Sequence, residues 1–331
     1  MNFIDCPGAD DFVGGVITAL NVTDMALMLI DAASGVEVGT VNQFRYADTL
    51  KKPVVLLVNQ MDHEKADYDN TLASLRDVYG SKITPVQYPI GSGATFNGII
   101  DVLKQKYYHW EPGDTAPQVL EIPESEKERA AEYYQVLLEA AAENDEGLME
   151  KFFDQGTLSE EEMREGIHKG MLNQSLYPLF CSSGEKNMAV HRIMNFLSMV
   201  APSPDDMPSP LNSEGVEVHP ADSEPASLYF FKTTVEPHIG EVSYFKVMSG
   251  VVKRVTILQI LIASLKRDLH NYIQLPGKCA TELLNFMQVV LVLRLNLKKF
   301  VQVIPLTQRV LTTCLILLNI LNHDIAELLR L

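Results

Sequence analysis

Three short polar stretches in this sequence follow apolar runs and carry side chains that could bind a ligand. The first is DCPG, which begins at Asp5, the second is NQMD, residues 59–62, and the third is SSGEKN, residues 182–187. A carboxylate can accept two N–H donors together, so Asp62 could read the donor edge of a heterocyclic base. Either aspartate taken alone is better explained as a strand-end side chain that caps a turn. The chemistry therefore depends on the elements that position these stretches.

Alternating strands and helices should position the first two stretches. MALMLIDA, residues 25–32, is a continuous apolar run typical of a parallel strand buried on both faces. Residues 39–52 have apolar side chains at helical spacing, Pro53 ends that helix, and residues 54–62 begin with a second buried strand. A strand, a helix and a strand of this length form a βαβ unit, whose ligands lie beyond the carboxyl ends of the strands. We therefore expect both polar stretches at one edge of a parallel sheet.

The remaining sequence up to residue 253 predicts an acidic helical segment, a linker and a β domain. Residues 118–175 predict helices with solvated acidic faces, and Ser159 and Glu162 have the spacing of a capping box. Residues 201–225 are rich in Pro, Ser and Asp and predict an interdomain linker. Two alternating segments around EPHIG then predict a hairpin that opens a β domain.

Composition excludes several classes of function and divides the chain near Lys253. The net charge of −16 argues against binding to nucleic acid. Asp5 interrupts the apolar run that a signal peptide would need, so we expect a cytoplasmic protein. Residues 1–253 carry 39 acidic and 18 basic side chains, whereas residues 254–331 carry 4 and 9 and include 20 leucines. We interpret the cysteines, which have neither C-x-x-C spacing nor a histidine cluster, as reduced thiols: Cys6, Cys181, Cys279 and Cys314.

Taken in order, the motifs resemble those of elongation factor G, the ribosomal translocation GTPase, and of its divergent bacterial paralogues. DCPGADDF resembles the family's D-x-P-G-H followed by V-D-F, NQMD resembles its N-K-x-D, and SSGEKN resembles its G-S-A-F-K-N. The stretch that begins at Pro89 resembles the start of the family's insert subdomain. FKTTVEPHIGEVSYFKVMSGVVK resembles the opening of its second, β-barrel domain. Several motifs in the right order make the resemblance specific, and it spans residues 1–253 almost without gaps.

The resemblance implies a site for GTP or GDP, and the side of that site that reads the base is present. Asp62 would accept two N–H groups of guanine and so select guanine over adenine. Asn59 would hold the neighbouring loops together and touch the base, while the backbone of Ser183 and Gly184 would meet the guanine oxygen. Gln60 stands where the family has a lysine whose stem covers the base, so we expect modestly weaker nucleotide binding.

Fewer groups are implied on the phosphate side of the same site. By resemblance, Asp5 would lie in the second coordination shell of a Mg²⁺ ion, and the Gly8 amide would point at the γ-phosphate. Ala9 stands where the family has the histidine that orients the attacking water, a role worth about 100- to 10,000-fold in rate. Some paralogues also lack this histidine. We therefore assign no catalytic residue.

The phosphate-binding loop of the family has no counterpart in the 331 residues, because no stretch fits G-x-x-x-x-G-K-[ST]. The amides, lysine and hydroxyl of such a loop hold the phosphates and Mg²⁺, so GTP binding should be weak without it. By resemblance the loop and the first strand would precede Met1, and we expect Met1 to be an internal start. The missing strand would lie between the strand that ends at Asp5 and the strand at residues 25–32. The two edges facing that place would then be unpaired.

The expected fold is α/β. It is a P-loop-NTPase-type G domain without its first strand and phosphate loop, with a helical insert subdomain, followed by the start of a β-barrel second domain. We expect the boundaries to be a partial G domain at residues 1–200 with the insert at about 88–175, a linker at 201–225, the barrel start at 226–253 and an out-of-frame tail at 254–331.

The tail is expected to be out of frame because it lacks the alternating strands and Gly/Asp turns that a barrel needs. The codons of the tail can be read in a shifted frame that starts at the third base of each codon. In that frame, HNYIQLPGKC, LLNFMQVVLVLRL and KFVQVIPL are compatible with QLYTAAGKMR, TELHAGGIGATV and VRTGDTL, respectively. These three sequences resemble the family's barrel. We hypothesise a one-nucleotide frameshift near Lys253, and coding DNA that cannot restore the family's sequence in the shifted frame would end this idea. The alternative is a genuine apolar helical tail, whose run VLTTCLILLNIL is too short to span a membrane.

Three functions stay open from the sequence. The chain could be a translational GTPase that acts with the ribosome during translocation. It could be a non-hydrolysing ribosome-interacting protein in which Ala9 is deliberate, or an incomplete, pseudogene-like product without activity. GTP binding separates the first of these from the third, and sedimentation with ribosomes separates the second from the third.

Overall fold

The computed structural model describes most of the chain up to residue 251 and five short strands beyond it. The residues it describes are 1–111, 113–114, 116–209, 215, 217–237, 240–251, 257–260, 265–268, 272–274, 291–293 and 314–319. Apart from the five strands, the predicted out-of-frame tail lies outside the described residues. The chain divides into two compact units, one formed by Phe3–Pro202 with Leu315–Leu331 and the other by Met1–Asn2 with Ser203–Cys314.

A six-stranded sheet forms the centre of the first unit, which confirms the predicted α/β class with a parallel sheet. Its strands, in order across the sheet, are β1 (Asn2–Cys6), β16 (Cys314–Asn319), β2 (Met25–Asp31), β3 (Val54–Asn59), β9 (Tyr177–Cys181) and β4 (Ile83–Pro85). The pairs β2–β3, β3–β9 and β4–β9 are parallel. All but the last residue of β2 and of β3 are buried, because a parallel strand covered on both faces needs apolar side chains throughout.

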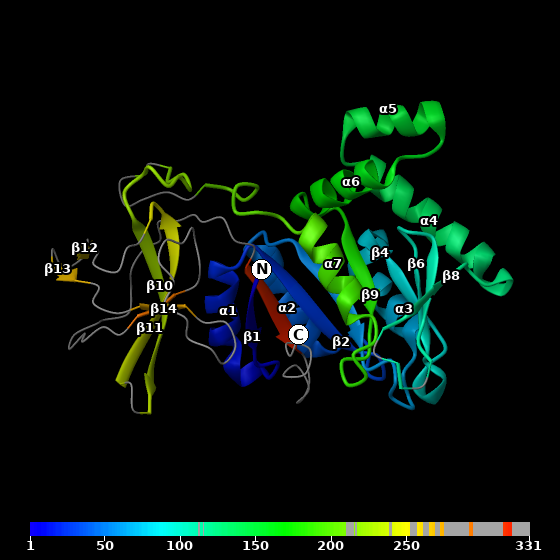
Figure 1. The fold of residues 1–331 in the computed structure, drawn as a ribbon, viewed down its shortest axis with the longest axis horizontal. Helices are drawn as coiled ribbons and strands as arrows, with labels where there is room; N and C mark the ends of the chain where they lie inside the picture. The colour runs from blue at the N-terminus through cyan, green and yellow to red at the C-terminus, as the bar shows by residue number, and fades with distance from the viewer. Residues whose placement is uncertain are drawn as a thin grey trace. The chain divides into compact units, whose positions relative to one another are not determined.

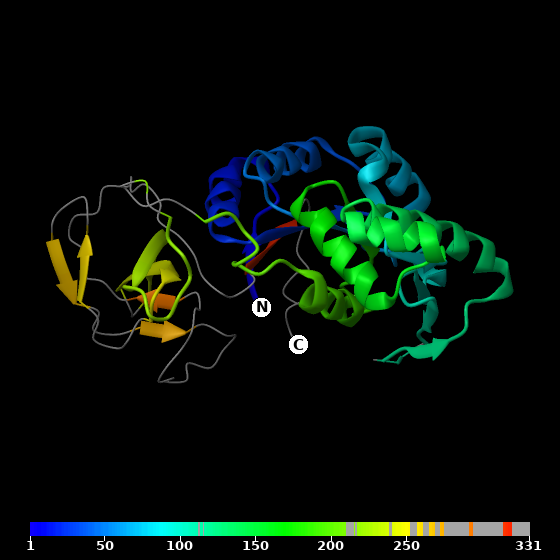
Figure 2. The ribbon, with the colours of Figure 1, turned by 90° about the horizontal axis from the view of Figure 1, so that it is seen from above.

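Helices cover both faces of this sheet (Figure 2). The helices α1 (Val13–Val22) and α2 (Val38–Thr49) lie on one side, and α7 (Val190–Val200) lies on the other. The helix predicted at residues 39–52 ends earlier, because Lys51 has a left-handed φ of 52° that continues no helix. Among the described helices, none is long and apolar enough to cross a membrane.

The strand β16 fills the place between β1 and β2, where the sequence predicts two unpaired edges (Figure 1). It runs parallel to β2, with Leu315 opposite Met25 and Asn319 opposite Leu29. The expectation of unpaired edges is therefore wrong for this chain, because backbone groups of both neighbouring strands find partners in β16. The alternative to a frameshifted tail is a helical tail, and it includes these six residues. In the structure they form a strand and not a helix.

The insert between β4 and β9 contains the helices that residues 118–175 predict, and four short strands that were not predicted from the sequence. Four antiparallel strands come first, in the order β5 (Gln87–Ile90), β6 (Gly98–Asp101), β7 (Lys106–His109) and β8 (Gln118–Leu120). Three helices follow: α4 (Lys127–Ala142), α5 (Glu146–Gln155) and α6 (Glu160–Leu172). The strands have only three or four residues each, which is too short for alternation of apolar and polar side chains to mark them.

The capping box predicted at the start of α6 is confirmed. Its Glu162 carboxylate makes the stability of the fold fall at acid pH. The Ser159 amide donates to Glu162 Oε2 at 2.9 Å, and the Glu162 amide donates to Ser159 Oγ at 3.3 Å. Three hydrogen bonds to the Glu162 carboxylate lower its pKa from 4.5 to about 2. The Lys151 ammonium makes the largest contribution, and the Ser159 amide and hydroxyl make the others. The charged carboxylate therefore stabilises the fold fully above pH 4.5, and this contribution disappears as pH falls towards 2.

We expect the replacement Glu162→Gln to lower the melting temperature at neutral pH, because it removes this charged acceptor. The difference between the parent chain and the variant should shrink as the buffer is acidified through the interval between 4.5 and about 2. Differential scanning calorimetry across this interval checks the prediction. A difference that stays constant with pH would show that the carboxylate charge is not involved.

Arg129 joins the insert to the core of the first unit. Its guanidinium lies 4.7 Å from the ring centre of Tyr88 in β5 and 5.4 Å from that of Tyr133 in α4. It also pairs with Asp69 in α3 (Tyr68–Tyr79), which belongs to the core. Because Arg129 is only partly exposed, its two ring contacts are stronger than those of a free surface cation.

We predict that Arg129→Ala lowers the free energy of unfolding by about 1–2 kcal/mol, through the lost ring contacts more than through the exposed ion pair. Urea unfolding checks the value. The matched control is Arg45→Ala, because Arg45 lies 5.7 Å from the ring of Tyr46 in the same helix and, within the described part of the chain, makes no link to another element. Equal effects of the two replacements would contradict the linking role.

The second unit contains the hairpin that the sequence predicts after the linker. The strands β10 (Ser227–Glu236) and β11 (Gly240–Ser249) pair antiparallel, with a bulge between Phe230 and Lys232. Two strands of the tail extend this sheet in the order β10-β11-β15-β14, namely β15 (Leu291–Leu293) and β14 (Tyr272–Gln274). A separate pair is formed by β12 (Ile257–Ile260) and β13 (Leu265–Asp268).

Candidate functional site

The loop after β3 begins at the carboxyl end of the strand and turns sharply. Gln60 adopts a left-handed φ of 63°, which is uncommon for a residue with a Cβ and is found where a turn has a special role. The Met61 side chain is fully buried, so it anchors the loop in the core. Asp62 follows and is only half-buried. The turn therefore presents a carboxylate near the sheet edge while its neighbour holds the loop down.

Asn59 joins this loop to the loop after β9. Its Oδ1 accepts a hydrogen bond from Ser182 Oγ at 3.0 Å and another from the Gly184 amide at 3.0 Å. The Met61 amide donates to the Ser182 carbonyl at 3.1 Å, which adds a backbone link between the same two loops. Because Ser182 is fully buried, its hydroxyl has no water to replace this acceptor. The two polar stretches thus form one connected structure.

The loop between β9 and α7 closes on itself. The Ser183 and Met188 amides each donate to the carbonyl of the other residue, at 3.2 and 3.0 Å. The Lys186 amide donates to Ser183 Oγ at 3.1 Å, and Asn187 takes a left-handed φ of 52°. These bonds fix the backbone around Gly184, so its position is set before any ligand arrives.

The carboxylate of Asp62 has no hydrogen-bond or ion-pair partner among the described residues. It lies in the same loop as Met61, whose amide bonds to Ser182, and therefore close to the paired loops. A half-buried carboxylate without a partner has its full capacity to accept N–H donors. The arrangement can receive a planar ligand that offers two adjacent donors.

The phosphate-side residues lie around the end of β1. Asp5 is exposed on the strand, yet partial desolvation raises its pKa from the ordinary value, against the lowering effect of a bond from the Cys6 amide. The Gly8 carbonyl accepts from Gln43 Nε2 of α2 at 3.0 Å, which ties this loop to the helix. Ala9 is exposed and carries no group that could orient a water molecule.

These residues form two separate halves of a site. The loop after β1 lies three strand positions from the loop after β3, or about 14 Å at the usual strand spacing. The structure therefore brings Asn59, Asp62 and Gly184 together but keeps Asp5 and its neighbours apart from them. Among the described residues, no group of three or more His, Cys, Asp or Glu side chains could hold a metal ion.

The described residues offer groups that suit a guanine base and fewer groups that suit its phosphates. On the base side, a partner-free carboxylate and a fixed backbone stand next to each other. On the phosphate side, the sequence has no G-x-x-x-x-G-K-[ST] loop to supply a lysine and a row of amides.

Sequence reasoning missed Ser182, which is the residue that connects the two loops through its side chain and its carbonyl. A signal was present, because Ser182 is the first polar residue after the buried strand β9 and precedes a second serine. A polar side chain in that place must find a buried partner. The predicted Asn59 supplies it.

Comparison with known proteins bears on the family and the fold of the chain. Residues 1–203 match the family described as "Elongation factor Tu GTP binding domain". The crystal structure of ttk003000868 from Thermus thermophilus is similar, with a TM-score of 0.73 and 29% sequence identity. The match covers 87% of this chain and 41% of that chain, so this chain spans well under half the length of its structural relative. Because the matched residues make up more than half of the 331-residue chain and include all three polar stretches, the chain belongs to the Elongation factor Tu GTP-binding domain family.

Proposed function

We propose that the chain recognises the guanine base of GTP or GDP through the loops that follow β3 and β9. The observation that supports this most strongly is the pair of hydrogen bonds from Ser182 and Gly184 to Asn59, beside a carboxylate that has no partner among the described residues. Membership of a family named for GTP binding agrees with this assignment. The same site would take either nucleotide, because both carry the same base.

Each residue has a distinct part in this proposal. Asp62 accepts two N–H groups from the edge of guanine, a pattern that adenine does not offer. Asn59 holds the second loop beside the base through the Gly184 amide, and the Ser183 amide bonds to the Met188 carbonyl, so the guanine oxygen would share one of these two donors. Gln60 lies over the base with a shorter and neutral side chain in place of a lysine stem, which weakens binding modestly.

The phosphate side contributes less in this proposal. Asp5 and Gly8 would face Mg²⁺ and the terminal phosphate, but the two groups alone form no cradle. Ala9 offers no atom to orient water, so we propose that this chain does not accelerate GTP hydrolysis appreciably. The wider assignment to elongation factor G, a partner role at the ribosome and a cytoplasmic location all belong to the same proposal.

A nuclear magnetic resonance titration of the full chain tests recognition of the base. We expect GDP to shift the amide signals of Gly184 and Lys186 in a saturable way, because both amides lie in the loop that would meet the base. ADP at the same concentration should leave them in place. Equal shifts with the two nucleotides, or none with GDP, would contradict the proposal.

Sedimentation with ribosomes tests the second part. A non-hydrolysing ribosome-interacting protein is the alternative that the exposed Ala9 favours. If the chain acts there, it should co-sediment with ribosomes and be released by high salt. A chain that binds GDP but never co-sediments would keep the base site and reject the partner. The predicted frameshift near Lys253 stays a prediction that coding DNA can test.

A further inference from the structure

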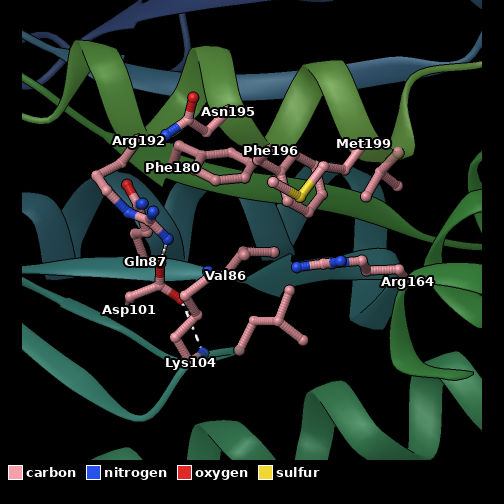
Figure 3. A pocket seen from close by; sticks show the side chains of 12 residues that line it. Val86, Gln87, Asp101, Lys104, Arg164, Phe180, Arg192, Asn195, Phe196 and Met199 are labelled. Carbon is pink, nitrogen blue, oxygen red and sulfur yellow. Dashed lines mark hydrogen bonds and ion pairs between the residues drawn. The ribbon is translucent and has the colours of Figure 1, made fainter. Parts of the chain in front are cut away.

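A small cavity lies in the first unit between α6, α7 and the strands β5 and β6 (Figure 3). Its volume is about 20 Å³, which is enough for one water molecule. Part of its lining is apolar and includes Phe180 and Phe196. The polar part includes Gln87 and Arg192, which come from β5 and from the first turn of α7.

Two residues of this lining each carry a buried polar atom that has no partner among the described residues. The atoms are Gln87 Oε1, which accepts hydrogen bonds, and Arg192 Nε, which donates one. Gln87 is only 1% exposed, so bulk water does not reach its oxygen. Leaving both atoms unpaired would cost about 1–3 kcal/mol each, a cost that native proteins rarely tolerate.

Arg192 cannot turn to satisfy its own Nε. Its terminal nitrogen pairs with Asp101 Oδ2, and its guanidinium lies 4.6 Å from the ring centre of Tyr108. Asp101 is in turn fixed by the Lys104 amide, which donates to Oδ1 at 3.0 Å. The Arg192 guanidinium is held at one end by the buried Asp101 carboxylate and covered on one face by the Tyr108 ring. Its Nε–H therefore keeps its present direction.

We propose that this cavity holds one ordered water molecule that accepts from Arg192 Nε–H and donates to Gln87 Oε1. The Gln87 oxygen needs a hydrogen-bond donor and the Arg192 Nε–H needs an acceptor, and a water molecule can be both. A halide ion could accept from the arginine but could not donate to the glutamine oxygen. A metal cation could meet the oxygen but would be repelled by the guanidinium.

The ion pair of Arg192 with Asp101, together with the proposed water, helps to position the loop between β9 and α7. Arg192 lies two residues after Val190, where α7 begins, and its amide donates to the Ala189 carbonyl at 3.0 Å. Ala189 directly follows Met188, whose backbone closes the loop on Ser183. Holding the first turn of α7 against β5 and β6 therefore positions the segment that carries Gly184. Gln87 and Arg192 are positioning residues for that loop.

A high-resolution crystal structure of the chain together with hydrogen exchange tests the inference without any nucleotide, so its failure is separate from failure of the proposed function. We expect electron density for one water within hydrogen-bond distance of both atoms. The replacement Gln87→Met keeps the length of the side chain but removes the acceptor. It should speed exchange of the Lys186 and Met188 amides by about tenfold, the effect of one lost hydrogen bond.

Ser198→Ala is the matched control, because the only bond of the Ser198 hydroxyl within the described part of the chain is to the Asn195 carbonyl of the same helix. It should leave exchange in the loop unchanged. Arg192→Lys keeps the charge beside Asp101 but lacks Nε, so it should also speed exchange. The inference is overturned by an empty cavity, by a halide there, by a direct Gln87–Arg192 bond, or by exchange in Gln87→Met that equals the control.

Discussion

Replacing Asp62 with asparagine is expected to weaken GDP binding by about 100-fold or more. The carboxylate would lose two charge-assisted hydrogen bonds to the base, worth about 1.5–3 kcal/mol each, and the new amide would place an N–H against an N–H. Competition against a fluorescent guanine nucleotide measures the change. Because Asp62 makes no bond to any other described residue, the fold should not be affected.

The same replacement should improve the binding of xanthosine diphosphate. Xanthine has a carbonyl where guanine has its amino group, and the asparagine amide can donate to that oxygen. A gain for xanthosine diphosphate together with the loss for GDP identifies Asp62 as the residue that reads this edge. If Asp62→Asn binds GDP as the parent chain does, the carboxylate does not read the base and the base site is wrongly placed.

Asn59→Ala is expected to lower the free energy of unfolding by about 2–4 kcal/mol and to loosen the loop after β9. It removes the acceptor of two hydrogen bonds and leaves the Ser182 hydroxyl buried without a partner. Urea unfolding measures the loss of stability. Hydrogen exchange of the Gly184 amide, which should become much faster, reports the loosening.

Two further variants identify the cause of that effect. Asn59→Asp keeps an oxygen that can accept from both donors, so it should retain most of the stability and the slow exchange of Gly184. Ser182→Ala removes one donor without leaving an unpaired one, so its effect should be smaller than that of Asn59→Ala. If all three variants behave alike, the loops are not held together through the Asn59 oxygen.

Long buried strands and their polar ends could be predicted from the sequence. The run at residues 25–32 forms β2 because a strand covered on both faces must be apolar throughout, and few other elements of that length require such a pattern. The resemblance implied that Asn59 holds the neighbouring loops together, and its Oδ1 accepts a hydrogen bond from the Gly184 amide. The role of Ser182 was not predicted, because its position directly after β9 indicates a buried polar side chain but not which residue, 123 positions away, is its partner.

Short strands and long-range strand pairing could not be predicted. The strand β6 has four residues, all buried, and no alternation distinguishes it from a loop. The position of β16 beside β2 depends on pairing between residues about 290 positions apart, which no window of sequence contains. The ion pair of Asp101 and Arg192 was missed for the same reason, since the two residues lie on separate elements of the first unit.

Calorimetry that compares guanosine with GDP tests the central claim most directly, namely that this chain binds the base but has no cradle for the phosphates. We predict that the two ligands bind the full chain with dissociation constants within a few-fold of each other, with and without Mg²⁺. Each phosphate held by a lysine and several amides adds charge-assisted bonds worth about tenfold or more apiece. GDP binding several hundred-fold tighter than guanosine would contradict the claim.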